Sequence, residues 1–94
     1  MKSLSIYVYI VECADNTLYT GCTNNITHRI QEHNSGRSGA KYTRSRRPVR
    51  LVYTEQRATL SDALRREGEI KRLSRAEKLL LIQSSRAREE GFST

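Results

Sequence analysis

Apolar and polar residues alternate along the first part of the chain in a way that is typical of β-strands. Residues 5–12 (SIYVYIVE) are mostly β-branched or aromatic and contain neither Gly nor Pro, which predicts a strand. Successive side chains of a strand point to opposite faces. The residues expected on the two faces are Ile6, Val8 and Ile10, and Tyr7, Tyr9 and Val11.

A polar turn and a second short strand follow, so a β-hairpin is predicted over residues 5–22. Asp15-Asn16 is typical turn chemistry, and residues 17–22 (TLYTGC) resemble a strand. The register stays open at this point. A three-residue loop over 14–16 would pair Tyr9 with Gly21 and put Tyr19 on the face of Tyr9, whereas a two-residue loop would move Tyr19 to the other face.

Three helices and a third strand are predicted after the hairpin. The helices are expected where apolar residues recur every three or four positions after a capping residue. The expected ranges are 26–34, 59–73 and 75–85 for the helices and 49–54 for the strand, with a loop rich in Gly, Ser and Arg over 35–47. Alternation in the strand would place Val49, Leu51 and Tyr53 on one face. The order β-β-α-β-α-α predicts an α+β fold in which helices flank a small three-stranded antiparallel sheet.

Length and composition indicate one small domain. The 94 residues support a single core, and we expect it to occupy residues 1–85, followed by a polar, disordered tail over 86–94. The longest apolar run, Leu79–Ile82, is far shorter than the roughly 20 residues that cross a bilayer. The start of the chain lacks the apolar segment of a signal peptide, which favours a cytoplasmic protein. Cys13 and Cys22 lack metal-ligand spacing and are expected to be buried, reduced thiols.

The chain is basic, with 17 Lys and Arg residues, 10 Asp and Glu residues and a formal net charge of +7. Such a surplus attracts polyanions. The cations are concentrated in the predicted loop over 35–47, which contains no acidic residue. The candidates for nucleic-acid binding are Arg37, Lys41, Tyr42, Arg44, Arg46 and Arg47, with Tyr42 able to stack on a base. A solvated basic surface is the alternative explanation.

One acidic residue interrupts the apolar stripe of the helix predicted over 59–73. The stripe consists of Leu60, Ala63, Leu64, Ile70 and Leu73. Glu67 falls inside it, three or four residues from its neighbours in the stripe. A carboxylate there would be partly buried, which is unfavourable without a partner cation. A Glu that reaches water at the edge of the stripe, a structural ion pair and a functional acid all fit this position.

Arg29 and His33 share one face of the helix predicted over 26–34, because they are four residues apart. A solvated polar face is the simpler explanation. A guanidinium can also hold a phosphate with two hydrogen bonds, and an imidazole can transfer a proton near neutral pH. Together with an acid that binds a hard cation such as Mg²⁺, these side chains would suit a site that cleaves phosphodiesters.

Several segments resemble the GIY-YIG nuclease superfamily. Tyr7-Val8-Tyr9 is similar to its first motif, with Tyr in place of Gly, and Tyr19-Thr20-Gly21 is similar to the second, with Thr in place of Ile. Arg29 follows Gly21 by eight residues, as the phosphate-contacting arginine of the family does, and Glu67 lies in ALRREGEIKRL, which resembles the helix with the metal-binding glutamate. The resemblance covers residues 5–82. It is strongest to small stand-alone bacterial proteins of the YhbQ and YazA type, and UvrC N-terminal domains and Slx-type endonucleases are more distant.

The resemblance implies a role for each matching residue. Tyr19, with Tyr9, would activate or orient the attacking water. Arg29 would bind the scissile phosphate, and His33 would assist proton transfer. Glu67 would hold one divalent metal ion, Mg²⁺ or alternatively Mn²⁺.

The same resemblance has one further implication and two departures. Gly21 would let the phosphate approach the strand. Cys22 stands where some members carry Lys, and no Asn follows Asn34, whereas many members carry an Asn beyond the glutamate helix. Neither departure removes the metal ligand or the arginine.

These features predict a metal-dependent endonuclease that hydrolyses DNA with low sequence specificity and acts on branched, damaged or single-stranded forms. The alternative is a nucleic-acid-binding module that keeps the fold but has weak or lost catalysis, and a protein-interaction adaptor is a third hypothesis. The expected partner is DNA, with RNA as an alternative. No membrane contact and no small-molecule cofactor are expected, and we expect a monomer.

Overall fold

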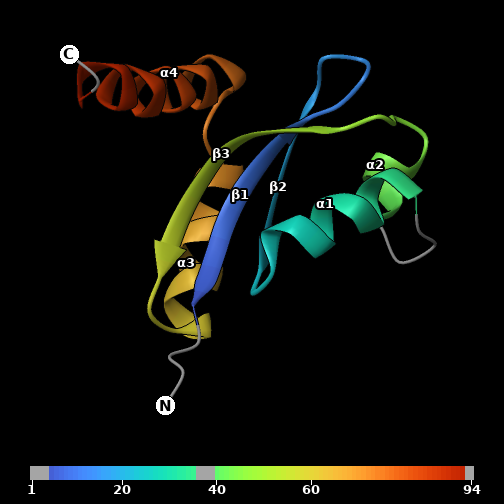
Figure 1. Ribbon diagram of the computed structural model, residues 1–94, viewed down its shortest axis with the longest axis horizontal. Coiled ribbons are helices and arrows are strands. Elements are labelled where there is room, and N and C mark those ends of the chain that lie inside the picture. The colour runs from blue at the N-terminus through green and yellow to red at the C-terminus, as the bar shows by residue number, and fades with distance from the viewer. Residues whose placement is uncertain (1–4, 36–39, 93–94) are drawn as a thin grey trace.

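The computed structural model describes residues 5–35 and 40–92 and has the predicted α+β architecture. Three antiparallel strands form one sheet in the order β2-β1-β3 (Figure 1). The strands are β1 (Ile6–Glu12), β2 (Leu18–Thr23) and β3 (Arg50–Arg57), and the helices are α1 (Ile26–Ser35), α2 (Lys41–Arg44), α3 (Leu60–Lys71) and α4 (Arg75–Phe92). None of the helices within the described ranges is long and apolar enough to cross a membrane.

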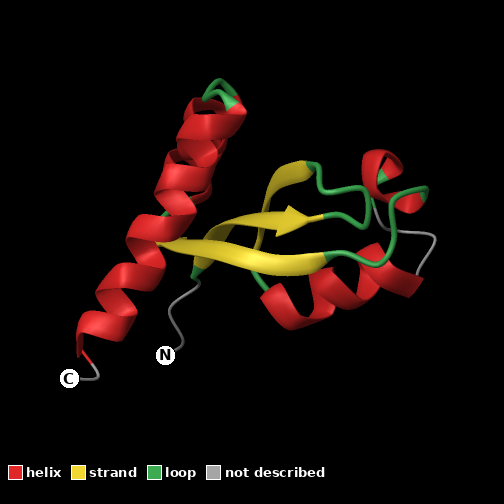
Figure 2. Ribbon diagram, turned by 90° about the horizontal axis from the view of Figure 1, so that it is seen from above, coloured by secondary structure: helices red, strands yellow, loops and turns green. Residues whose placement is uncertain are grey.

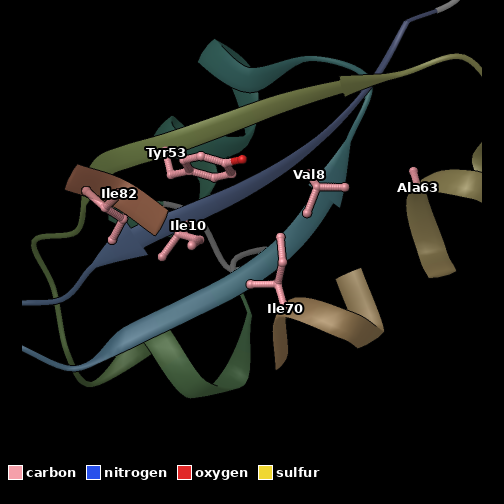
Figure 3. Close-up of a cluster of buried hydrophobic side chains, with 6 residues drawn as sticks. All are labelled: Val8, Ile10, Tyr53, Ala63, Ile70 and Ile82. Atoms are coloured by element: carbon pink, nitrogen blue, oxygen red, sulfur yellow. The ribbon is translucent and has the colours of Figure 1, made fainter. Parts of the chain in front are cut away.

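Helices cover both faces of the sheet, so the central strand β1 is buried on both sides (Figure 2). On one face, Ile26 and Ile30 of α1 pack against a cluster that contains Tyr9 and Val11. On the other face, α3 and α4 complete the larger core, which consists of Val8, Ile10, Tyr53, Ala63, Ile70 and Ile82 (Figure 3). The predicted division of β1 into two faces is therefore confirmed.

The hairpin has the three-residue loop. Tyr9 pairs with Gly21 and Val11 pairs with Tyr19. Asn16 has a φ of 69°, a conformation that Asn tolerates better than most residues. Since directly paired residues share a face, Tyr9 and Tyr19 lie on the same side of the sheet, the side covered by α1.

A β-bulge interrupts the pairing of β1 with β3. Ile10 pairs with Tyr53, whereas Val11 pairs with Leu51, so β3 has one extra residue at this point. As a result Tyr53 lies in the core under α3, Val49 lies in the cluster under α1, and Leu51 is exposed. The prediction that these three residues share one face is therefore wrong.

Several predicted bounds also differ from the structure. The short helix α2 lies inside the predicted 35–47 loop, and β3 continues to Arg57 rather than ending at residue 54. The helix predicted over 75–85 continues to Phe92, so the disordered tail expected from residue 86 is helical up to that point. Ala, Arg and Glu dominate residues 86–90, and these are strong helix formers.

The apolar stripe of α3 is narrower than predicted. Ala63 and Ile70 are buried in the core, but Leu60 and Leu64 are exposed. Ion pairs on the same helix strengthen its contact with β3. Arg66 donates to Glu55 from Nε at 2.8 Å and from Nη2 at 3.1 Å, and Tyr53 also donates to this carboxylate.

Candidate active site

The phenol of Tyr9 lies at the centre of the candidate site, directly above Gly21. Tyr9 is 1% exposed, and its ring occupies the space over the paired glycine of β2. A Cβ atom at position 21 would lie only 2.6 Å from Tyr9 Oη and 2.8 Å from Cζ. Gly21 is therefore required to make room for Tyr9, a different reason from the predicted approach of a phosphate.

His33 of α1 is fully buried and links Tyr9 to α2. Its Nε2 lies 2.8 Å from Tyr9 Oη, and its Nδ1 lies 2.8 Å from Thr43 Oγ1. The Thr43 hydroxyl donates its hydrogen to the carbonyl of Ala40 at 3.0 Å, so it must accept a hydrogen from Nδ1. In the neutral imidazole, Nε2 then carries no hydrogen and accepts one from Tyr9.

Electrostatics keep this imidazole neutral. Burial lowers the pKa of His33, and the nearby positive charge of Arg29 lowers it further. Burial raises the pKa of Tyr9, while a hydrogen bond from Arg29 acts in the opposite direction. The pair at neutral pH is therefore a neutral phenol that donates to a neutral, proton-accepting imidazole.

Arg29 approaches Tyr9 from the same helix α1. Its Nη1 also donates to Glu32 Oε1 at 3.0 Å, and the Glu32 side chain is 23% exposed. Glu32 thus holds the guanidinium next to the phenol. Glu32 is a site residue missing from the predicted set, although its spacing of three residues from Arg29 on a helix is a recognisable signal.

Glu67 reaches the site from α3, on the other side of the sheet. Its side chain is 16% exposed, so the predicted partial burial is observed. Cys22 Sγ donates to Oε1 at 3.0 Å, and Lys71 Nζ lies 2.8 Å from Oε2 and supplies the partner cation. The negative charge of Glu67 raises the pKa of Tyr9, so Glu67 and Arg29 both act on the same phenol from opposite sides.

Tyr19 is the partly exposed phenol of the site. Its ring meets His33 edge to face at 5.4 Å and stacks on Tyr42 of α2 at 5.8 Å. The Arg46 guanidinium lies 4.0 Å from the centre of the Tyr42 ring. The ring of Tyr42 is therefore already engaged by two side chains, and a nucleobase would compete with them for it.

The predicted basic surface is only partly available for nucleic acid. Arg46 binds Asp15 at 3.0 Å, and Arg47 donates to the carbonyl of His33 at 2.6 Å, so both arginines tie the segment after α2 to the rest of the domain. Lys41 and Arg44 are exposed on α2. Arg37 lies outside the described residues.

Comparison with known proteins shows the family of this chain. The model of the GIY-YIG catalytic domain family matches residues 5–80. This chain belongs to the GIY-YIG domain family. The resemblance seen in the two tyrosine motifs is thereby confirmed.

Relatives of the domain are proteins of the UPF0213 group. The UPF0213 protein of Syntrophus aciditrophicus is 63% identical over 79 residues, which cover 84% of this chain and 91% of that protein. The solution NMR structure of the UPF0213 protein BH0048 from Bacillus halodurans is 47% identical and has a TM-score of 0.55, covering 84% of this chain and 83% of that one. The solution NMR structure of EF2693 from E. faecalis is 38% identical with a TM-score of 0.60, covering 88% of each chain.

A divalent metal ion in this GIY-YIG domain would depend on Glu67. No group of three or more His, Cys, Asp or Glu side chains within the described part of the chain could hold a metal ion. Mg²⁺ usually keeps several waters and needs one or two carboxylates together with substrate phosphates, so a single carboxylate fits. A metal ion there would compete with Lys71, which bonds one of the two carboxylate oxygens.

Proposed function

We propose that this GIY-YIG domain is a metal-dependent endonuclease that hydrolyses DNA phosphodiester bonds with low sequence specificity, including those of branched or damaged DNA. The convergence on Tyr9 carries the proposal. A proton-accepting imidazole is hydrogen-bonded to its phenol, and the charges of Arg29 and Glu67 both act on it. Such an arrangement of acid, base and cation is what phosphoryl chemistry requires.

Tyr9 and Tyr19 would together activate and orient the attacking water. Tyr9 is buried and already donates its hydrogen to neutral His33, so it can pass a proton to the imidazole. Tyr19 is more exposed and lies against the same imidazole, so it is the phenol that meets solvent and substrate. The hydrogen-bonded pair of Tyr9 and His33 would accept the proton of the attacking water.

Arg29 and Glu67 would act on the phosphate from the two sides of the phenol. Arg29, oriented by Glu32, would hold the scissile phosphate and stabilise the charge that develops on it. Glu67 would hold Mg²⁺ or Mn²⁺, which supplies Lewis-acid stabilisation of the leaving oxygen when bound.

Affinity for nucleic acid would come mainly from the cations beside the site. Lys41 and Arg44 are exposed on α2, next to the Tyr19 and Tyr42 stack. Contacts of this kind are made to phosphates, which position the nucleic acid but do not read its sequence. Low sequence specificity follows from this.

A cleavage assay on single-stranded, duplex, nicked and branched DNA, with Mg²⁺ or Mn²⁺, tests the proposal. Glu67→Gln and Arg29→Ala are expected to slow cleavage by about 100-fold or more, because each removes a charge needed in the transition state. Glu69→Gln and Arg65→Ala are matched controls on α3, since both side chains are more exposed, at 40% and 67%. The proposed site is wrong if the wild type cleaves DNA and both Glu67→Gln and Arg29→Ala cleave it as fast as the wild type.

A nucleic-acid-binding module without useful turnover is the second candidate. The observation in its favour is that Cys22 and Lys71 already bond the two carboxylate oxygens of Glu67. This candidate predicts that none of the DNA forms is cleaved, while binding weakens steeply as salt concentration rises. Cleavage that is lost in Glu67→Gln but kept in Glu69→Gln would exclude it.

A further inference from the structure

Both carboxylate oxygens of Glu67 already accept hydrogen bonds, and Lys71 is the charged donor of the two. Its Nζ lies 2.8 Å from Glu67 Oε2, and the other oxygen accepts a hydrogen from Cys22 at 3.0 Å. The Glu67 side chain is only 16% exposed, whereas that of Lys71 is 52% exposed. The carboxylate is thus fixed between a thiol of β2 and an ammonium that reaches in from the solvent side.

A helix-stabilising ion pair is the simplest explanation of this contact. Glu four residues before Lys is the favourable orientation, and such pairs are common on solvated helix faces. Glu67 does not lie on such a face, because it points to β2, where Cys22 contacts both its carboxylate and the carbonyl of Ala63. The pair lies at the candidate site, because the same carboxylate also accepts a hydrogen from Cys22 of β2.

The ammonium and a divalent cation would compete for this carboxylate. Lys71 donates a hydrogen to Oε2 at 2.8 Å, and its positive charge would repel a divalent cation bound to the same carboxylate. Lysine has a flexible four-carbon stem, and this one is half-exposed, so it can swing into solvent. Cys22 has no comparable effect, because its thiol brings no positive charge to the other oxygen, to which it donates at 3.0 Å.

We propose that Lys71 is a positioning residue that holds Glu67 ready for use and that leaves when a divalent cation binds the carboxylate. This inference rests on the proposed function, because it takes Glu67 as the metal ligand. Lys71 would then set the metal concentration at which the domain is loaded. It would also hold the carboxylate in place while no metal is bound.

Binding of Mn²⁺ to the protein alone, followed through the electron paramagnetic resonance signal of free Mn²⁺, tests the inference without any cleavage. Lys71→Met keeps most of the side-chain volume but removes the competing charge, so it is expected to bind Mn²⁺ about three- to tenfold more tightly than the wild type. Lys71→Arg restores the charge and is expected to return the affinity close to that of the wild type. Lys78→Met is the charge-matched control, because it removes one lysine charge from α4.

The outcomes separate this inference from the proposed function. Tighter binding in Lys71→Met, restored by Lys71→Arg and absent in Lys78→Met, supports the exchange. Equal affinities in the wild type and Lys71→Met, with loss of binding in Glu67→Gln, would overturn the exchange and leave Glu67 as the metal ligand. Unchanged Mn²⁺ binding in Glu67→Gln would overturn both.

Discussion

Replacement of Gly21 by Ala tests the geometry around Tyr9 more sharply than any other single change. The added Cβ would lie 2.6 Å from Tyr9 Oη, 2.8 Å from Cζ and 3.1 Å from Cε2. Ordinary carbon contacts are about 3.5–4.0 Å, so the end of the phenol must move by roughly 1 Å. Tyr9 is 1% exposed, which leaves it little space for such a movement.

The magnitude follows from two separate losses. Overpacking a buried site costs about 1–3 kcal/mol. Displacement of the phenol also breaks or weakens its 2.8 Å hydrogen bond to His33, which adds about 1 kcal/mol. We therefore expect Gly21→Ala to lower the free energy of unfolding by about 2–4 kcal/mol, measured by urea denaturation at neutral pH.

Gly68→Ala on α3 is the matched control with the opposite expected sign. Its added Cβ would meet only Arg72 Nη1, at 3.6 Å, an ordinary contact. Because Gly inside a helix is unfavourable, this variant should be more stable than the wild type by about 0.5–1 kcal/mol. The account of Tyr9 and Gly21 would be refuted if both alanine variants were as stable as the wild type or more so.

Three further predictions concern single groups. Thr20→Val should stabilise the fold by about 1 kcal/mol in urea denaturation, because the buried Thr20 hydroxyl has no hydrogen-bond partner among the described residues; equal or lower stability would contradict this. Burial opposes ionisation of Glu55, but hydrogen bonds from Arg66 and others overcome it and lower its pKa from 4.5 to about 2. The wild type should therefore lose about 2–3 kcal/mol of stability as pH falls from 4.5 to 2, and Glu55→Gln, already less stable at neutral pH, should not show this loss. Burial lowers the pKa of His33, so the imidazole should stay neutral, and cleavage should continue, down to a pH below 6.5. A cleavage rate that already falls with decreasing pH above 6.5 would argue against His33 as the proton acceptor.

The hairpin and its two faces were predictable because strand alternation depends only on local sequence. Residues 5–12 carry this pattern clearly, and the structure places Val8 and Ile10 in one core and Tyr9 and Val11 in the other. The register was not predictable, because Asp15-Asn16 fits a two-residue loop as well as a three-residue loop. The bulge in β3 was missed for a related reason, since it exists only in the pairing of two strands that are distant in sequence.

The candidate site was predictable where a residue broke a local pattern. Glu67 could be singled out because a carboxylate interrupts an apolar stripe, and the structure shows it partly buried. Thr43, which fixes the tautomer of His33, breaks no pattern and lies in a short helix inside a predicted loop. Lys71 follows Glu67 by four residues, so its contact was detectable from helix geometry, but the contact of Cys22 with the same carboxylate was not.

The sequence also did not show which cations of the basic segment over residues 35–47 have structural roles. Arg46 and Arg47 were predicted to belong to a nucleic-acid-binding surface. In the structure Arg46 binds Asp15 of the hairpin loop, and Arg47 donates to the carbonyl of His33. Both contacts join segments that are far apart in sequence, and charge composition alone does not show which cations are used in this way. The roles of the site residues in catalysis stay predictions.

Single-turnover cleavage of a branched DNA in Mg²⁺ by Glu67→Gln and Glu69→Gln, each against the wild type, tests the central claim most directly. The two variants remove one carboxylate charge each from the same helix, two residues apart. The account predicts that Glu69→Gln cleaves at close to the wild-type rate and that Glu67→Gln is slower by about 100-fold or more. Equal rates in the two variants, or cleavage that does not need a divalent metal, would contradict it.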